Sequence, residues 1–318
     1  MITVQDVTWV RIAAPDLDLM ETFLEDFGML RAARTATRLY MRGRGGEPFV
    51  HVTELGDPRP IGFGLRAGSA LDLAALARKF NTSVQPRTEP GGGDEVVIQD
   101  PDGNRIEVVC GLAGSNQASS RAPFKFNPAA GRARPGGTIR VKTAPSQVQR
   151  LGHVMLRTAQ FDVLRAFYTG MFGMRISDNY YMGTADNTIA SFLHCGLKQQ
   201  LVDHHTIAIV GDGHTGFEHI AFEVLDLDDL MSGNRHLMAQ NRWKHSWGVG
   251  RHIEGSQIFD YWRDPFGNKI EHWTDGDLVN DEYVAGNVEF NPMQCLAQWG
   301  PPPTADFMGQ NSPPQESR

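Results

Sequence analysis

The sequence predicts an α+β protein of two tandem domains, each built from two βαβββ modules. Three observations lead to this prediction: the chain length, a degenerate internal repeat, and the succession of short apolar strands with single amphipathic helices. The chain has 318 residues, of which 41% are hydrophobic and 21% are charged. Such a length and balance are typical of two globular domains. Because an exposed sheet edge is a liability, we expect the sheet of each domain to curl.

The repeat is clearest at the start of each half. Residues 7–32 and 151–176 each contain an alternating strand, a turn and an amphipathic helix that ends in Phe-Gly-Met. A repeated pattern of this kind indicates a duplicated structural unit. Gly28 and Gly173 follow the two helices, where a left-handed residue commonly ends a helix.

A second pair of matching segments lies near the end of each half. Residues 99–107 match residues 263–271, and both contain the pattern Asp-Pro-x-Gly-Asn. This pattern is strong turn chemistry and predicts a hairpin between two strands. The matching positions are farther apart here than at the start of the halves, so the second half carries insertions.

The remaining elements complete the modules. In the first half we expect strands at 49–55, 61–67, 95–99 and 104–111 and a helix at 71–80. In the second half we expect strands at 188–195, 205–211, 218–224, 257–263 and 268–274 and a helix at 227–241. The predicted organisation is a non-catalytic domain at 1–135, a linker at 136–147, a metal-binding domain at 148–299, and a Pro-rich, poorly ordered tail at 300–318.

Composition excludes several classes of function. The net charge is −7, and the basic residues between 132 and 150 are interrupted by Gly and Pro, which favours a solvated linker over a nucleic-acid surface. The three cysteines are widely spaced and contain no CxxC pair, so neither a disulfide framework nor a zinc ribbon is expected. No signal-like or membrane-spanning apolar run is present. We therefore expect a cytoplasmic protein without nucleic-acid or membrane partners.

Three polar residues stand inside strands of the second half and predict a metal site. They are His153, His219 and Glu271. Side chains alternate along a strand, so each has a defined face, and the three meet if those faces line one cavity. Two imidazoles and one carboxylate form the facial triad that holds Fe(II) and leaves positions open for substrate and O₂.

The first half lacks this set, which predicts that only one copy of the scaffold binds metal. Trp9 stands at the position of the first histidine, and Gly62 or Gly64 lies near the position of the second. Glu107 matches the carboxylate. A duplicated scaffold with one functional copy explains this asymmetry.

Further acid–base candidates lie beside the ligands. His205 begins a predicted strand, His252 ends a Gly-broken loop at 247–252, and Tyr261 belongs to the strand that follows. A diol must lose protons to bind a metal, and a nearby His or Tyr can accept or share them. A buried aromatic role is the alternative interpretation for Tyr261.

Taken together, these residues resemble the type I extradiol dioxygenases of the vicinal oxygen chelate (glyoxalase/bleomycin resistance) superfamily. The resemblance covers residues 4–300, and its most specific parts are Gly152-His153, residues 205–208, residues 218–222, and Gly250-Arg-His252 with Tyr261 and Glu271 following. It implies βαβββ modules that curl into a partly open barrel, with Fe(II) in the second domain; Mn(II) is the alternative metal.

The resemblance also implies roles for particular residues. His153, His219 and Glu271 would ligate the metal. His205 would act as acid or base near oxygen, and His252 and Tyr261 would contact the substrate oxygens. By position, Met155, Phe192 and Ala208 would line the pocket. The implied reaction is the opening of the ring of a catecholic substrate by O₂, in the degradation of aromatic compounds. The resemblance also implies that the protein is a homo-oligomer.

Two features depart from the family pattern. Glu254 stands where extradiol dioxygenases of the dihydroxybiphenyl dioxygenase kind carry Asn. A carboxylate there indicates either a polar or hydroxylated substrate ring or a side chain that points to solvent. Residues 196–203 form a longer hairpin than the family pattern predicts. The remaining alternatives are a glyoxalase-type isomerase or thiol transferase of the same superfamily, and a non-enzymatic small-molecule binding protein.

Overall fold

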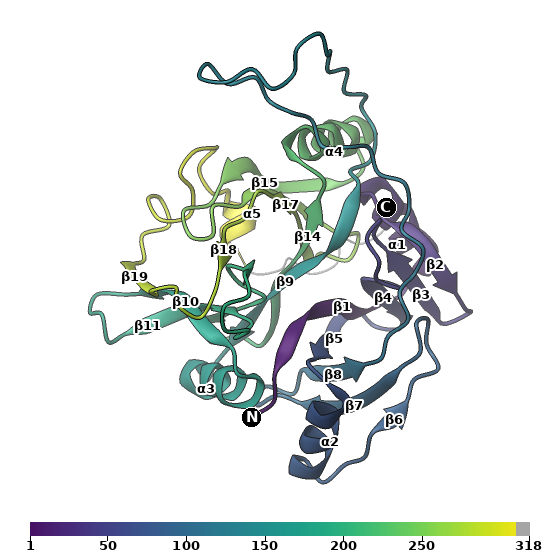
Figure 1. Cartoon of the computed structure of the whole chain (residues 1–318), viewed down its shortest axis with the longest axis vertical. Coiled ribbons are helices and arrows are strands. Elements are labelled where there is room, and N and C mark those ends of the chain that lie inside the picture. The colour runs from purple at the N-terminus through teal and green to yellow at the C-terminus, as the bar shows by residue number, and fades with distance from the viewer. Residues whose placement is uncertain (310–318) are drawn as a thin grey trace.

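The computed structural model describes residues 1–309 and contains two large mixed sheets, one in each half of the chain (Figure 1). The first sheet consists of β1 (Val4–Ala14), β2 (Leu30–Arg34), β3 (Arg38–Arg42), β4 (His51–Leu55), β5 (Arg59–Ala67), β6 (Gln85–Pro86), β7 (Asp94–Gln99) and β8 (Arg105–Cys110). The second consists of β9 (Val148–Thr158), β10 (Arg175–Tyr181), β11 (Thr188–His194), β13 (Ile207–Gly211), β14 (Gly216–Val224), β15 (Lys244–Arg251), β16 (Ile258–Arg263), β17 (Lys269–Thr274) and β19 (Gly286–Glu289).

Both sheets are built from two copies of the predicted βαβββ module. The strand orders are β2-β3-β4-β1-β5-β8-β7-β6 and β15-β16-β17-β14-β9-β13-β11-β10-β19. In each sheet the first strands of the two modules pair antiparallel at the centre, as β1 with β5 and β9 with β14. The predicted α+β class with two tandem domains is thereby confirmed, and each predicted strand and helix lies within two residues of its expected ends.

One helix covers each module, and local sequence explains where most of the helices begin and end. The helices are α1 (Leu17–Phe27), α2 (Ala70–Lys79), α3 (Phe161–Phe172) and α4 (Leu227–Gln240). Asp16 and Asp226 accept hydrogen bonds from free backbone N–H groups at the starts of α1 and α4. Gly28 and Gly173 adopt the left-handed conformation after α1 and α3, as predicted.

The two domains share one hydrophobic core. Phe63 on β5 stacks against Tyr168 on α3 with ring centroids 6.4 Å apart. Phe27 at the end of α1 stacks on His272 of β17 at 3.6 Å, and its carbonyl oxygen lies 2.7 Å from the His272 Nε2. Because side chains alternate along β17, anchoring His272 in the domain interface fixes Glu271 on the opposite face of the strand.

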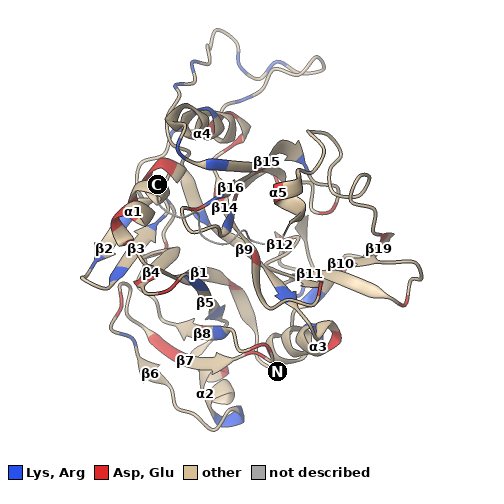
Figure 2. Ribbon diagram, turned by 180° about the vertical axis from the view of Figure 1, so that it is seen from behind, with Lys and Arg blue, Asp and Glu red and all other residues tan. Residues whose placement is uncertain are grey.

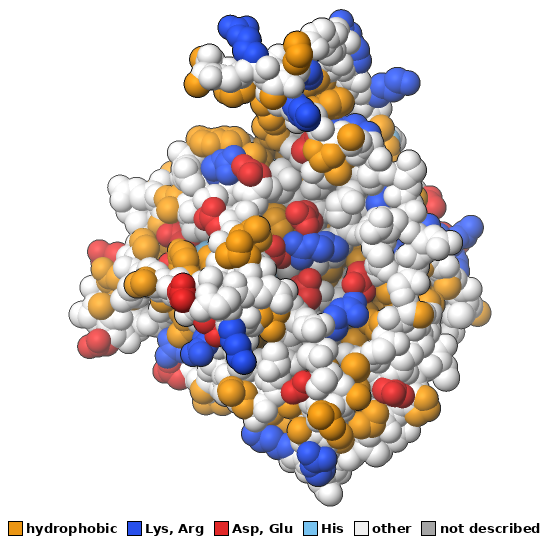
Figure 3. Space-filling model, viewed as in Figure 1, with side chains coloured by type: hydrophobic (Ala, Val, Ile, Leu, Met, Phe, Trp, Pro, Cys, Tyr) orange, Lys and Arg blue, Asp and Glu red, His pale blue; other side chains and the backbone are white. Residues whose placement is uncertain are grey.

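Charged side chains of both signs are distributed over the two domains (Figure 2), and on one face they lie next to one another near the middle of the molecule (Figure 3). Arg150 at the start of the second domain illustrates this arrangement. It pairs with Asp203 at 2.6 Å, with Glu223 at 2.7 Å and with Asp6 of the first domain at 3.5 Å. None of the helices between residues 1 and 309 is long and apolar enough to cross a membrane.

The connecting and inserted segments have definite places. Residues 111–147 contain no helix or strand and extend beyond α4 (Figure 1). Residues 196–203 lead into the short strand β12 (Val202–Asp203), which pairs with β18 (Leu278–Val279). The longer hairpin is therefore held to the chain that follows β17. The predicted domain boundaries stay predictions.

Two local expectations were wrong. Residues 247–251, expected as a loop, belong to β15, and one register shift of its pairing with β16 lies between Gly248 and Gly250. The start of the expected tail at 300–318 is folded: α5 (Ala305–Met308) begins at the capping Thr304, and Phe307 packs on Trp247 with ring centroids 4.4 Å apart. Apolar packing against the second sheet orders this Pro-rich segment; Pro313-Pro314 lie outside the described residues.

Candidate metal centre

Strand register brings the three predicted ligands onto one face of the second sheet. His153 on β9 lies opposite Ala221 on β14, and Ala221 lies opposite Glu271 on β17. His219 precedes Ala221 by two residues and therefore shares its face. Three neighbouring strands thus direct their side chains toward one point.

The ligand atoms are spaced as they would be around one ion. His153 Nε2 lies 3.1 Å from His219 Nε2, and Glu271 Oε2 lies 3.3 Å from the first and 3.5 Å from the second. Nitrogen and oxygen ligands held about 2.1 Å from a divalent ion are about 3.0–3.4 Å apart at adjacent positions. All three residues are buried, and neither carboxylate oxygen of Glu271 has a hydrogen-bond partner within the described chain. A buried carboxylate without a partner is costly, so these residues fit a bound cation.

The environment sets the protonation state that metal binding requires. Burial, together with the neighbouring His219, lowers the pKa of His153 well below its usual value, so its imidazole is neutral. Burial raises the pKa of Glu271, whereas the neighbouring His219 and His252 oppose that rise. A cation at the centre of the three side chains would stabilise the ionised carboxylate.

The ion pair between Glu218 and Lys269 lies behind His219 and orients its ring. Glu218 bonds to His219 Nδ1, which leaves Nε2 directed at the other two ligands. Lys269, itself buried, bonds to the other oxygen of Glu218 and donates to the carbonyl of Phe307 at 3.0 Å. Burial alone would raise the pKa of Glu218, but the Lys269 ammonium and the hydrogen bond to His219 hold it far below its usual range. A carboxylate behind a ligating histidine commonly fixes its tautomer and strengthens metal binding.

A pocket of about 500 Å³ opens beside the candidate ligands, with His153 and His219 in its wall, whereas Glu271 is fully buried. Its walls are formed mainly by apolar side chains of β9, β10, β11 and β13 and of the chain after residue 289. Met155, Phe192 and Ala208, the three side chains expected to line it by position, do so, and Glu254, for which two interpretations were open, also lines it. Their contact with a substrate stays a prediction.

The three predicted acid–base residues also meet at this pocket. His205 stacks obliquely on His153 with ring centroids 4.2 Å apart. His252 Nδ1 lies 2.7 Å from the carbonyl of Leu296, and its Nε2 lies 2.8 Å from the hydroxyl of Tyr261. A proton on Nδ1 donates to that carbonyl, so Nε2 faces the pocket as an acceptor. Burial raises the pKa of Tyr261 well above its usual value, so this residue is a neutral phenol.

Sequence reasoning missed several polar residues in the pocket wall or bonded to it. His204 bonds to His205 and to Asp178, and all three side chains are buried. Tyr180 bonds to Glu254, which therefore lies in the pocket wall and does not point to solvent. Only the adjacency of two histidines was visible in the sequence, because Asp178 lies 26 residues before His204 and Tyr180 lies 74 residues before Glu254.

The corresponding place in the first domain is filled by protein. Trp9 Nε1 donates to Glu107 at 2.8 Å, and the Arg11 guanidinium bonds to both oxygens of the same carboxylate at 3.0 Å. Arg11 lies opposite Gly62 as Met155 lies opposite His219, so Gly62 is the counterpart of the second histidine. A fixed guanidinium thus neutralises the carboxylate that an ion would hold in the second domain.

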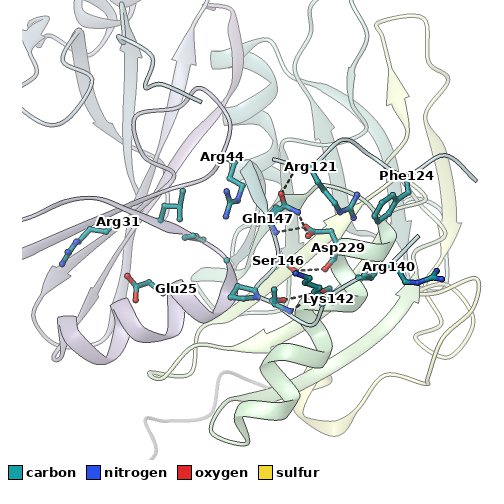
Figure 4. A pocket seen from close by; sticks show the side chains of 17 residues that line it. Glu25, Arg31, Arg44, Arg121, Phe124, Arg140, Lys142, Ser146, Gln147 and Asp229 are labelled. Carbon is teal, nitrogen blue, oxygen red and sulfur yellow. Dashed lines mark hydrogen bonds between the residues drawn. The ribbon is translucent and has the colours of Figure 1, made fainter. Parts of the chain in front are cut away.

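A further cavity of about 580 Å³ lies under the linker (Figure 4). Arg121, Ser146 and Gln147 line it and fasten the linker to α4: Arg121 pairs with Asp226, and the other two bond to Asp229. The ligand residues lie outside this cavity. The pocket of about 500 Å³ beside the metal ligands is therefore the candidate active site.

The fold and this donor set define a metal-dependent member of a known superfamily. Residues 150–272 match the Glyoxalase/Bleomycin resistance protein/Dioxygenase superfamily. The chain is 31% identical to metapyrocatechase 2 of Cupriavidus necator over 94% of this chain and 89% of that protein. It is 25% identical to an iron-dependent extradiol dioxygenase of Rhodococcus jostii over 66% of each chain. The chain belongs to the extradiol ring-cleavage dioxygenases of this superfamily.

Solved structures show the same fold. The Mn(II)-bound glyoxalase of Novosphingobium aromaticivorans has a TM-score of 0.77 at 24% identity, covering 99% of this chain and 97% of that one. Homoprotocatechuate 2,3-dioxygenase of Arthrobacter globiformis has a TM-score of 0.77 at 19% identity, covering 98% and 92%. The same scaffold therefore occurs in proteins named for different chemistries, and the side chains around the metal must carry the functional argument.

Proposed function

We propose that this protein uses Fe(II) and O₂ to open the ring of a catechol-type diol beside its hydroxyl groups, in the degradation of aromatic compounds. The observation that carries the proposal is the combination of three convergent ligands with His205, His252 and Tyr261 around one pocket. A bound Fe(II) ion supplies coordination sites for the diol and O₂ and a path for electrons between them.

The protein's own residues manage protons and orientation in this proposal. The acceptor Nε2 of His252 lies 3.8 Å from Glu271 Oε1, within reach of a diol hydroxyl placed beside the ligands. That nitrogen accepts from the Tyr261 hydroxyl in the free protein; in the proposal the diol hydroxyl takes the place of Tyr261 as donor, and the Tyr261 hydroxyl turns to the same substrate oxygen. His205 faces the pocket from the side of His153 and serves as the acid or base near oxygen. The apolar walls hold the ring and exclude water.

The test is anaerobic loading with Fe(II) followed by O₂ uptake on a panel of catechols. We expect uptake together with the absorbance of a ring-opened muconic semialdehyde-type product. Loading with Mn(II) in parallel identifies the active metal. Absence of O₂ uptake across the panel would overturn the proposal and favour an isomerase, a thiol transferase or a binding protein of the superfamily.

Two variants assign the residues. His219→Ala leaves two protein ligands, so we expect it to lose the metal. His205→Phe keeps all three ligands, so we expect full iron content and slow turnover. Trp9→Ala in the first domain is the matched control and retains the metal. Loss of iron from His205→Phe would contradict the ligand assignment.

We infer the assembly from the resemblance and the location from the sequence, in which we found no signal-like or membrane-spanning run. We expect a homo-oligomer in the cytoplasm. Sedimentation of the purified chain measures the first, and a sedimenting species with the 35.2 kDa mass of one chain would contradict it.

A further inference from the structure

His205 is the inner end of a buried chain of three polar side chains. Its Nδ1 lies 3.1 Å from Nδ1 of His204, whose Nε2 lies 2.6 Å from Oδ2 of Asp178. The three side chains are only 4%, 1% and 5% exposed, respectively. The opposite oxygen of the carboxylate, Oδ1, accepts from the backbone N–H of Gly286 at 2.7 Å. Oδ2 also accepts a longer hydrogen bond from the Tyr283 hydroxyl, at 3.5 Å, whereas every other contact in this chain has its own atom.

The donors and acceptors in this chain can be assigned by elimination. Asp178 is an acceptor at both oxygens, so His204 must donate from Nε2. A neutral His204 then has a lone pair on Nδ1 and accepts from Nδ1–H of His205. That leaves Nε2 of His205 as a lone-pair acceptor for the pocket. The carboxylate thus sets the tautomer of a side chain two hydrogen bonds away.

The surrounding packing keeps the chain rigid. Phe192 packs edge-on against His205 with ring centroids 5.2 Å apart and lies 5.9 Å from the ring of His204. Gly255 has a φ of +77°, and a side chain there would meet His204 Nδ1 at 3.0 Å. Glycine at this position leaves room for the ring.

We propose that His204 and Asp178 form a proton relay behind His205, and this inference rests on the proposed function. When Nε2 of His205 takes a proton in the pocket, its Nδ1–H passes to Nδ1 of His204. The resulting imidazolium then lies beside the Asp178 carboxylate, away from the histidines at the metal centre. The proton comes from a hydroxyl of the diol in the pocket, so one O–H bond is broken and one N–H bond is formed at His205 Nε2, and within the relay only N–H bonds are made and broken. The reverse transfer returns the proton to oxygen. His204 and Asp178 are positioning residues, because they act through His205.

Asp178→Asn gives a sharp test. An Asn whose oxygen keeps the Gly286 contact presents its NH₂ group to His204 Nε2. His204 must then carry its proton on Nδ1 and donate to His205, which moves the His205 proton to Nε2. We therefore expect both tautomers to reverse. Nitrogen-15 NMR of histidine-labelled, metal-free protein reads the tautomers directly, without any activity measurement. A wild-type His205 that carries its proton on Nε2 would overturn the proposal.

Kinetics of the Fe(II) enzyme provide the second readout. We expect kcat of Asp178→Asn to fall by about a hundredfold, as for loss of a positioned acid–base group, with KM and iron content nearly unchanged. Asp186→Asn, an exposed carboxylate in the β10–β11 hairpin, is the matched control and keeps wild-type kcat. An unchanged kcat in Asp178→Asn with reversed tautomers would refute the relay.

A second variant tests the relay independently, in case Asp178→Asn does not fold. His204→Gln interrupts the chain and should lower kcat similarly, and adding it to His205→Phe should cause no further loss, because the residues act as one unit. Additive losses would contradict the relay. If the wild-type enzyme opens no diol, the proposed function fails while the NMR tautomers remain interpretable.

Discussion

Glu218→Gln is the most informative change next to the metal centre. Glu218 lies between Lys269 and His219, and its carboxylate accepts from both. A glutamine keeps the shape but removes the charge. The His219 ring then loses its anionic partner at Nδ1, and its Nε2 becomes a weaker ligand.

The magnitude follows from the two contacts. Loss of an orienting carboxylate behind a ligating histidine weakens metal binding about ten- to a hundredfold, or roughly 1.4–2.7 kcal/mol. Lys269, only 2% exposed, also loses its counter-charge, and an unpaired buried charge costs about 3–5 kcal/mol of folding stability. Adding Lys269→Met removes that cation and should restore most of the stability without restoring metal affinity.

Chelator competition with Fe(II) or Mn(II) measures the metal Kd, and denaturant unfolding of the metal-free protein measures stability. Glu223→Gln is the matched control on the same strand. The Glu223 side chain is 30% exposed, and its ion pair with Arg150 lies outside the pocket. We expect the Kd of Glu223→Gln to stay at the wild-type value. A wild-type Kd in folded Glu218→Gln would refute the orienting role of this carboxylate.

Two further predictions concern stability and the pocket wall. Burial lowers the pKa of His51 to about 3. Between about pH 3 and pH 6.5 the folded chain therefore binds fewer protons at this residue than the unfolded chain does. The stability present above about pH 6.5 is lost as the pH falls toward 3, by up to about 1.4 kcal/mol per pH unit. His51→Gln should flatten the acid slope of the unfolding free energy by that amount, and an unchanged slope between pH 4 and 6 would contradict the assignment. Phe307 packs on Tyr261 with ring centroids 4.9 Å apart and lines the pocket. Phe307→Ala should therefore raise KM for a catechol by up to about tenfold, equivalent to ~1.4 kcal/mol, and leave the metal Kd unchanged. Met293→Ala, at a 68% exposed side chain, is the control, and equal KM values in the two variants would show that α5 does not shape the pocket.

The sequence was sufficient for the architecture and for the ligand set because both depend on short-range patterns. The repeat placed His153 and His219 on the first strands of two successive modules and Glu271 in the segment that matches residues 99–107, and a period of two along each strand fixed their faces. The same repeat showed that Trp9 and Glu107 occupy the equivalent place in a domain without the ligand set. Register in the structure then identified Gly62, rather than Gly64, as the third counterpart.

The residues that sequence reasoning missed are joined by contacts between distant segments. Asp178 reaches His204 because β11 pairs with β10 on one side and with β13, the strand that follows His204, on the other. Phe307 covers the pocket because Asp306 binds Lys244 and Arg263, which no local pattern near the Pro-rich end reveals. A composition rich in proline and polar residues predicted disorder there, whereas tertiary packing determines the outcome.

The most direct test of the central claim is electron paramagnetic resonance of the anaerobic Fe(II) protein exposed to nitric oxide. If His153, His219 and Glu271 hold one ion with open positions toward the pocket, nitric oxide should bind and give an iron–nitrosyl signal that changes when a catechol is added. His219→Ala should give no such signal. An iron-loaded protein that does not bind nitric oxide, or a signal that survives in His219→Ala, would contradict the account.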